Sequence, residues 1–168
     1  MKEKNDIIEN KMLMYEYFIA VRLLNKVLED EGSKLAREMG LTLSQYTAFR
    51  IISNQEGLLI SEIAKIGSWH ISTVMTILTG LLKKSLVKYK PVQKGRGSYV
   101  YLTDLGRDII KENSGWYSPK FLEVLENEGI KRNLHNVYKI IGEAYGGEHI
   151  KDIKEHILKS RHKMSGRE

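Results

Sequence analysis

Hydrophobic residues recur at steps of three and four along most of the chain, which predicts a protein built mainly from helices. The first helix is expected to run from Ile7 to about Glu29. Glycine is unfavourable inside a helix, so Gly32 is expected to end it. Residues 33–39 are then expected to form a short second helix before Gly40.

The N-terminal helix has a wide apolar face. Two adjoining stripes form this face: Met14, Phe18, Val21, Leu24 and Leu28, and beside them Leu13, Tyr17, Ala20 and Val27. One neighbouring element cannot cover a face of this width. The helix is therefore either a core helix packed on two sides or, as the pattern favours, a helix that also meets a second copy of the chain. The predicted dimer interface contains Met14, Tyr17, Phe18 and Val21.

Two short elements are expected next. Thr42 followed by Gln45 has the spacing of a capping box, so a helix should begin there and end before Gly57. Residues 58–60 form an apolar run that predicts a short edge strand.

The segment that follows predicts a helix-turn-helix. Ser61 is expected to be the N-cap of a short helix, and Gly67 is expected to end it and form the turn, which Trp69 closes. The second, longer helix has a buried stripe formed by Val74, Ile77, Leu78, Leu81 and Leu82. A short helix, a turn with glycine and a longer helix are typical of the motif. Gly80 is interpreted as allowing the close approach of a backbone or a phosphate.

A β-hairpin is expected directly after this motif. Residues 86–91 and 98–102 are rich in strand-forming side chains, and residues 93–97 between them contain two glycines and a basic tip. A helix-turn-helix followed by such a hairpin is a winged helix. This order of elements is more specific than either part alone.

The sequence from Thr103 onward predicts further helices. Thr103 should cap one that ends near 113–115, and Ser118 with Pro119 should start another that runs to about Asn127. Two more are expected over 131–144 and 148–160, with Gly129, Gly146 and Gly147 as separators. The predicted fold is mainly α: N-terminal dimerisation helices over 1–40, a winged helix-turn-helix domain with a small hairpin wing over 41–112, a C-terminal helical dimerisation region over 113–160, and a flexible tail over 161–168.

Composition narrows the function classes. The 168 residues include no cysteine, which excludes disulfides and thiolate metal sites. The N-terminus lacks the apolar core of a signal peptide, and no segment approaches the length of a membrane span. The chain is expected to be a cytoplasmic protein with no membrane partner and no cofactor.

The charge distribution points to a polyanionic partner. Residues 63–103 contain no acidic residue, and their seven basic residues exceed the net charge of +6 of the whole chain. They are Lys65, Lys83, Lys84, Lys88, Lys90, Lys94 and Arg96. A block of one sign builds a field that attracts polyanions. Together with the winged-helix pattern, it predicts a reader of duplex DNA.

The predicted recognition helix would carry short polar side chains into the major groove. The candidate contacts there are His70, Ser72, Thr73, Thr76 and Thr79, with Ser61 on the preceding helix. Candidate phosphate contacts are Lys83, Lys84, Lys88 and Lys90, while Lys94 and Arg96 at the wing tip would reach the neighbouring minor groove. The helix lacks Arg and Asn, so shape and phosphate contacts should contribute much of the binding.

Other function classes have less support. The sequence contains no phosphate-binding loop, no paired-carboxylate motif and no nucleophile elbow, so it does not predict an enzyme. A winged helix used for protein or RNA binding remains an alternative, which the acid-free block and a symmetric dimer disfavour. The spacing of His135, His149, His156 and His162 with Glu143 and Glu155 matches no metal-site motif, so no metal site is predicted.

Three segments carry a resemblance to a known family. They are residues 61–64 (Ser-Glu-Ile-Ala), residues 81–87 (Leu-Leu-Lys-Lys-Ser-Leu-Val), and Arg96 followed by residues 100–106 (Val-Tyr-Leu-Thr-Asp-Leu-Gly). Through them, residues 41–112 resemble the MarR family of winged-helix transcription regulators. Residues 61–72 and Tyr145-Gly146-Gly147 are similar to the Hpr branch of that family.

The resemblance implies a homodimer formed by N- and C-terminal helices that binds a pseudo-palindromic operator. It also implies repression of protease-production and sporulation genes, and it allows a small-molecule effector, often an aromatic acid, whose identity the sequence does not name. The chain departs from the family pattern at Lys94, where an acidic residue is usual, and at Ser85, where glycine is usual.

Overall fold

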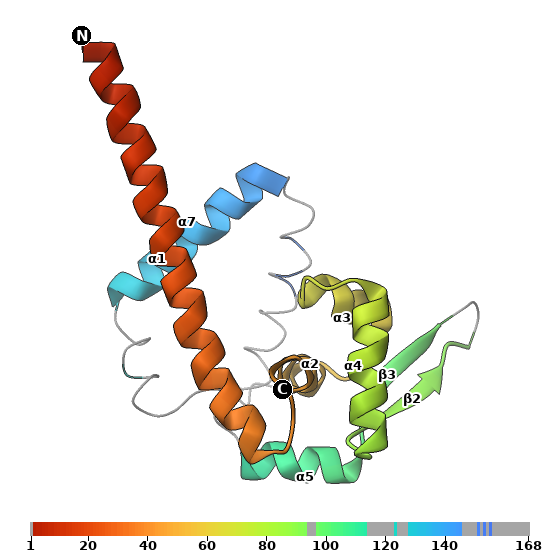
Figure 1. Ribbon diagram of the computed structural model, residues 1–168. Coiled ribbons are helices and arrows are strands. Elements are labelled where there is room, and N and C mark those ends of the chain that lie inside the picture. Colours follow the sequence, from red (N-terminus) through yellow and green to blue (C-terminus); the bar gives the residue numbers. More distant parts are fainter. Residues whose placement is uncertain are drawn as a thin grey trace.

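A long N-terminal helix leads into a small winged helix, from which a β-hairpin projects on the far side (Figure 1). The structure is a computed structural model that describes residues 2–93, 97–113 and 128–145, together with the single positions 123, 151, 153 and 155. The elements in chain order are α1 (Lys2–Glu38), α2 (Leu43–Asn54), β1 (Leu58–Leu59), α3 (Ile60–Ile66), α4 (Ile71–Lys83), β2 (Val87–Pro91), β3 (Ser98–Leu102), α5 (Asp104–Glu112) and α7 (Glu128–Tyr145). The mainly helical winged fold predicted from the sequence is confirmed.

Helix α1 is continuous through Gly32, so the predicted break there is wrong. A glycine inside a helix costs only about 1 kcal/mol relative to alanine, which packing can offset. A Cβ added at Gly32 would lie 2.9 Å from Cδ1 of Leu43, so the missing side chain lets α1 lie close to α2. The helix ends instead at Glu38, two residues before Gly40. The φ of Gly40 is 64°, a left-handed conformation that favours glycine.

Helix α2 begins with the capping box that the sequence predicts. Gln45 N donates to Thr42 Oγ1 at 3.2 Å, and Thr42 N donates to Gln45 Oε1, also at 3.2 Å. Six of the twelve residues of α2 are buried, including Arg50, whose guanidinium donates to Tyr46 Oη and to the carbonyl of Asn113. Helix α2 is therefore the central element of the core, and Arg50 joins it to the end of α5.

Ser61 is not the N-cap of α3, which begins at Ile60 after Leu59. Glu62 replaces the expected cap, because its Oε2 accepts a hydrogen bond from Leu59 N at 2.6 Å. Gly67 ends α3 as expected, but the left-handed residue of the turn is Ser68, with φ of 54°. A side chain at Gly67 would collide with the ring of Trp69. The backbone N–H of Trp69 donates to the Ala64 carbonyl at 2.8 Å. Trp69 thus closes the turn.

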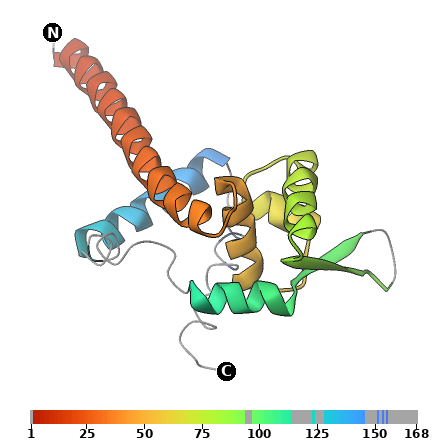
Figure 2. The ribbon, with the colours of Figure 1, turned by 60° about the horizontal axis from the view of Figure 1, so that its bottom comes forward.

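The three strands form one antiparallel sheet with the order β1-β3-β2, so β1 is an edge strand, as predicted. Leu58 pairs with Val100 on one side of β3, and Val87 pairs with Leu102 on the other. The β2–β3 hairpin extends to the pair Pro91 and Ser98 and projects away from the helices (Figure 2). Residues 94–96 at its tip lie outside the described residues.

The buried apolar core consists of residues between Ala36 and Leu102. It contains the predicted stripe of α4, with Val74, Ile77, Leu78 and Leu81 buried, while Leu82 is half-buried at its edge. Only the last turn of α1 contributes to this core. The turns just before it, from Asn25 to Gly32, face α2 across a pocket, and the N-terminal half of α1 extends away from the winged helix (Figures 1 and 2).

Helix α5 is attached to the start of β2 through backbone groups. Thr103 caps α5, as predicted, by accepting from Gly106 N at 3.0 Å, and its own N–H donates to the Leu86 carbonyl at 3.1 Å. A Cβ at Gly106 would collide with the same Leu86 carbonyl. Glycine at this position therefore permits a backbone contact that a larger residue would block.

The predicted helix over 131–144 is present as α7, which starts earlier and contains Gly129, so this glycine does not separate two helices. A glycine near the first turn of an 18-residue helix is readily tolerated. The predicted helix at Ser118 and Pro119, the separators Gly146 and Gly147, most of the helix over 148–160 and the tail over 161–168 lie outside the described residues.

Ser85 follows α4 with a φ of 57°, in the left-handed region. A residue with a Cβ is disfavoured there by about 1–2 kcal/mol, and glycine gives back part of that difference through its greater loss of backbone freedom. Ser85→Gly is therefore expected to raise the free energy of unfolding by about 0.5–1 kcal/mol in urea denaturation. The matched control is Ser72→Gly in helical backbone, which should lower it by about 0.5 kcal/mol. A Ser85→Gly protein no more stable than the wild type would contradict this account.

Candidate nucleic-acid interface

Helix α4 has one buried and one exposed face. The candidate recognition residues His70, Ser72, Thr73, Thr76 and Thr79 are all exposed, on or next to the helix, and Ser61 is exposed on α3. The buried stripe holds the opposite face against the core. The sequence reading and the structure therefore agree on where these side chains lie.

Two of the exposed hydroxyl groups on α4 are already engaged as donors. Thr76 Oγ1 donates to the Ser72 carbonyl at 3.1 Å, and Thr79 Oγ1 donates to the Met75 carbonyl at 2.8 Å. A hydroxyl has one hydrogen to donate. These threonines therefore offer an acceptor oxygen and a methyl group to a partner, rather than the donor and acceptor pair that the sequence suggests.

The candidate phosphate contacts gather where α4 ends and β2 begins. Lys83 is the last residue of α4 and Lys84 its C-cap, while Lys88 and Lys90 alternate along β2, and all four side chains are exposed. Lys88 and Lys90 are two residues apart on a strand, so they share one face. The remaining candidates, Lys94 and Arg96, lie outside the described residues.

Three carboxylates near the acid-free stretch, Glu56, Glu62 and Asp104, are engaged elsewhere, and Asp104 accepts from Arg107 Nη1 at 2.8 Å. Glu62 caps α3, and Glu56 accepts from Arg107 Nε at 3.1 Å, from Arg107 Nη2 at 2.8 Å and from Leu102 N at 3.2 Å. The hydrogen bonds and charge of Glu56 raise the pKa of Arg107 above its ordinary value. Among the described residues, no carboxylate forms an ion pair with Lys83, Lys84, Lys88 or Lys90. The four ammonium groups are left available to an anionic partner.

Tyr89 lies between the two lysines of β2. Burial raises the pKa of its hydroxyl, so the side chain stays neutral and adds no negative charge to this surface.

Gly80 accommodates another side chain of the protein. A Cβ at this position would collide with the amide nitrogen of Gln45, the residue that completes the capping box of α2. The interpretation that Gly80 admits a backbone or a phosphate is therefore wrong. Its role is to let α2 and α4 pack closely, which fixes the orientation of the exposed face of α4.

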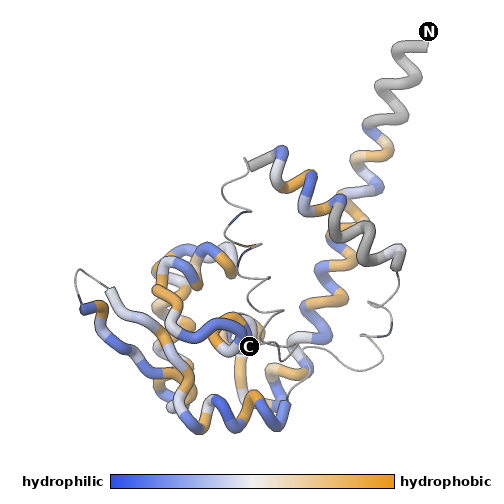
Figure 3. The backbone as a smooth tube through the Cα atoms, turned by 180° about the vertical axis from the view of Figure 1, so that it is seen from behind, coloured by the Kyte–Doolittle hydropathy of each residue, from blue (hydrophilic) through white to orange (hydrophobic). Residues whose placement is uncertain are grey.

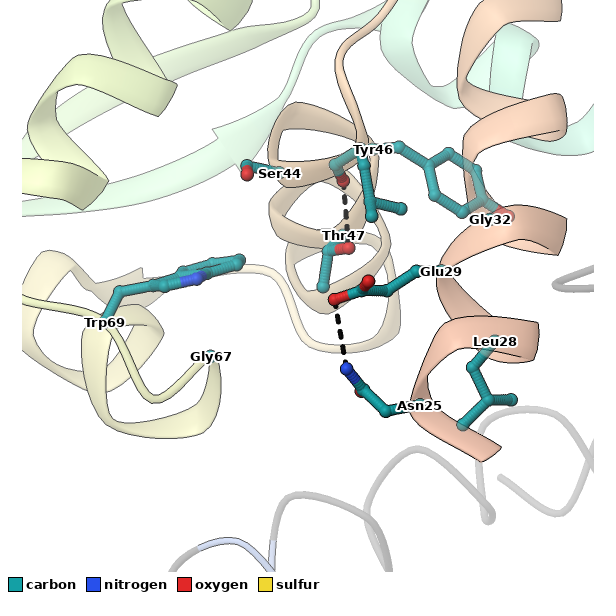
Figure 4. A pocket seen from close by; sticks show the side chains of 10 residues that line it. Asn25, Leu28, Glu29, Gly32, Ser44, Tyr46, Thr47, Gly67 and Trp69 are labelled. Carbon is teal, nitrogen blue, oxygen red and sulfur yellow. Dashed lines mark hydrogen bonds between the residues drawn. The ribbon is translucent and has the colours of Figure 1, made fainter. Parts of the chain in front are cut away.

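A cavity of about 370 Å³ lies between α1, α2 and the turn before α4 (Figure 4). Its described lining consists of Asn25, Leu28, Glu29, Gly32, Leu43, Ser44, Tyr46, Thr47, Gly67 and Trp69. Asn25 donates to Glu29 at 3.1 Å on the α1 side, and Trp69 lies across from them. This lining contains a carboxylate and no basic residue, so it is poorly suited to an aromatic acid.

Two exposed residues of α4 escaped the sequence reading. Ile71 and Met75 lie on the exposed part of the helix, although their side chains are large and apolar. The hydrophobic pattern of the sequence could have predicted their exposure, because neither residue belongs to the buried stripe that contains Val74, Ile77 and Leu78.

The described residues form neither a metal site nor a membrane span. In that part of the chain, no three His, Asp, Glu or Cys side chains come close enough together to hold a metal ion. His149, His156 and His162 lie outside it. Among the described helices, none is long and apolar enough to cross a membrane.

Comparison with known proteins identifies the winged helix. Residues 41–91 match the MarR family. The HTH-type transcriptional regulator Hpr of Lysinibacillus sphaericus is 26% identical over 157 residues, which cover 88% of this chain and 84% of that protein. Hpr of Bacillus cereus is 24% identical over 178 residues, with 96% of each chain covered. Residues 41–91 therefore resemble the MarR family, and most of the chain is similar to Hpr.

Solved structures of MarR-type regulators share its fold. A MarR-family regulator from Silicibacter pomeroyi matches with a TM-score of 0.65 and 21% identity, covering 80% of this chain and 92% of that one. The structure of reduced AbfR bound to DNA matches with a TM-score of 0.64 and 18% identity. The match covers 79% of this chain and 96% of the AbfR chain. The curated relatives reported above are named as transcriptional regulators, which are not enzymes.

Proposed function

We propose that this MarR-type regulator is a sequence-specific repressor that binds a pseudo-palindromic operator as a homodimer. Helix α4 enters the major groove, and its exposed polar residues meet the base edges. The lysines at the end of α4 and on β2 hold phosphates, and Lys94 and Arg96 at the wing tip reach the adjacent minor groove. The protein acts in the cytoplasm, where its operator is accessible.

The observation that carries the proposal is the uninterrupted basic surface beside an exposed helix. Lys83, Lys84, Lys88 and Lys90 are exposed and unpaired among the described residues, and the flanking Glu56 and Glu62 are held in other hydrogen bonds. Phosphates dominate the affinity of such proteins for DNA, so a face without carboxylates is what a duplex requires. AbfR, which has the same fold, was solved with DNA bound.

The dimer is supported by the apolar surface of α1. Eleven of the sixteen large hydrophobic side chains exposed in the described residues lie between Met12 and Val27. Apolar positions recur along this part of the helix, away from the core (Figure 3). An exposed apolar surface of this extent marks an association site. A second copy of α1 is the partner that would cover both stripes, including Met14, Tyr17, Phe18 and Val21.

The resemblance to Hpr supports repression as the regulatory output. It also supports protease-production genes and sporulation genes as the targets. The domain boundaries at residues 40, 112 and 160 are also part of it, with the helical ends serving dimerisation. A dimer that occupies a promoter through two recognition helices would block transcription sterically.

The test is selection of bound duplexes from a random pool, followed by measurement of affinity against salt concentration. We expect an inverted repeat whose half-sites lie about one helical turn apart, and a steep loss of affinity with rising salt. Recovery of no common sequence, or of a single unrepeated site, would contradict the proposal. Preferential recovery of single-stranded RNA in a parallel selection would favour the alternative, an RNA-binding winged helix.

A further inference from the structure

Two large apolar side chains are exposed on the surface of α4. Ile71 is 57% exposed and Met75 is 44% exposed. They are four residues apart and therefore neighbours on one side of the helix. The core does not use them, and together they form an apolar patch at the edge of a polar face. An exposed apolar patch of this kind can serve as a contact surface for a binding partner.

The position of this patch restricts what the partner is. Ile71 is the first residue of α4, and Met75 lies one turn later, beside the exposed Ser72 and Thr76. In a helix-turn-helix, the N-terminal residues of the second helix contact base edges, while the basic residues around them contact phosphates. The candidate phosphate contacts Lys83, Lys84, Lys88 and Lys90 lie at the other end of α4 and on β2, and Lys65 lies on the neighbouring helix α3. Ile71 and Met75 would therefore meet bases.

The major groove offers one apolar group, the C5 methyl of thymine, among its donors and acceptors. An apolar side chain placed against guanine would remove water from N7 and O6 without returning a hydrogen bond. The hydroxyl hydrogens of Thr76 and Thr79 are directed to the helix backbone, so these residues do not supply that donor either. The part of the exposed face formed by Ile71, Met75, Thr76 and Thr79 is thus suited to thymine and poorly suited to guanine.

We propose that Ile71 and Met75 are specificity-determining residues that contact thymine methyl groups in the major groove. This inference rests on the proposed function and adds the class of sequence read by the first two turns of α4. The A·T pairs beneath those turns are recognised through their methyl groups, without a bidentate hydrogen bond.

The experiment removes the C5 methyl group of individual thymines from the DNA while it keeps their pairing with adenine. Each thymine of the duplex selected by the wild-type protein is replaced in turn by deoxyuridine, and affinity is measured by fluorescence anisotropy at one salt concentration. A methyl group buried in a contact contributes about fourfold in affinity. We expect a loss of this size at one or two thymines per half-site. Ile71→Ala and Met75→Ala should bind the thymine duplex more weakly and should each lose discrimination at a single position.

The matched control is Lys84→Ala, which should weaken binding to the thymine and deoxyuridine duplexes equally and so keep the discrimination. Alanine favours helix, and both apolar positions are exposed, so thermal unfolding should show that the variants fold. Equal affinity of the wild type for all deoxyuridine duplexes would overturn this inference while leaving sequence-specific binding intact. Discrimination that persists in both alanine variants would also overturn it. Failure to select any duplex would instead overturn the proposed function.

Discussion

Replacing Met14 and Phe18 together with glutamate is expected to leave the protein monomeric and to weaken operator binding at least about a hundredfold. Their side chains are 67% and 58% exposed in the single chain, and the proposed dimer would bury them. Burying carboxylates without partners is strongly unfavourable. A monomer holds only one half-site, so it loses the high effective concentration that links the two binding events. Sedimentation velocity and anisotropy titration measure the two effects.

The control for this pair is Lys11→Gln with Lys26→Gln, which changes the net charge of the same helix by the same amount and leaves the apolar stripes intact. It should remain dimeric. Both proteins should unfold normally, because the buried core begins only at Ala36. A double glutamate variant that remains dimeric would place the interface elsewhere, and a monomer with undiminished affinity would argue against a two-fold operator.

Replacing Lys83 and Lys88 with glutamate is expected to weaken duplex binding about a hundredfold near 0.1 M salt and to flatten its salt dependence. Each lysine that contacts a phosphate releases about one counterion, so each loss should reduce the slope of log affinity against log salt by about 0.9 per subunit. Glutamate adds repulsion to that loss. Because both side chains are exposed, the free energy of unfolding should change little.

A second pair separates local contacts from overall charge. Lys26→Glu with Lys111→Glu removes two exposed lysines that pair with Asp30 and Asp108, outside the acid-free stretch, and changes the net charge equally. Its affinity should fall far less, since neither lysine lies near α4 or β2. Equal losses for the two pairs would mean that binding follows net charge alone, with no defined interface.

The parts of this fold that could be predicted from sequence have local causes. Thr42 with Gln45, and Thr103 ahead of α5, place the residue types that a helix start requires within four positions of one another. The hairpin follows in the same way from strand-forming residues on either side of a glycine-rich tip. The exposed polar face of α4 could be predicted because Val74, Ile77, Leu78 and Leu81 fix which side is buried.

Two of the wrong predictions concern glycines whose roles depend on contacts with residues of another helix. The continuity of α1 at Gly32 depends on Leu43, and the role of Gly80 depends on Gln45, more than thirty positions away. Ser61 is not a cap because α3 already begins at Ile60, which places Ser61 inside the helix. The polarity of Thr76 and Thr79 toward a partner depends on hydroxyl orientation, which a sequence pattern does not carry.

The continuity of α1 gives this helix a mechanical role. Its 37 residues, at a rise of 1.5 Å each, make a rod about 55 Å long. One end belongs to the proposed dimer contact and the other is built into the core that supports α4, with no joint at Gly32 to absorb rotation. A change of one degree in the angle between two such rods displaces the far end by about 1 Å, by simple geometry over that length. The spacing of the two recognition helices would then be set by the crossing angle of the paired rods, far from any base.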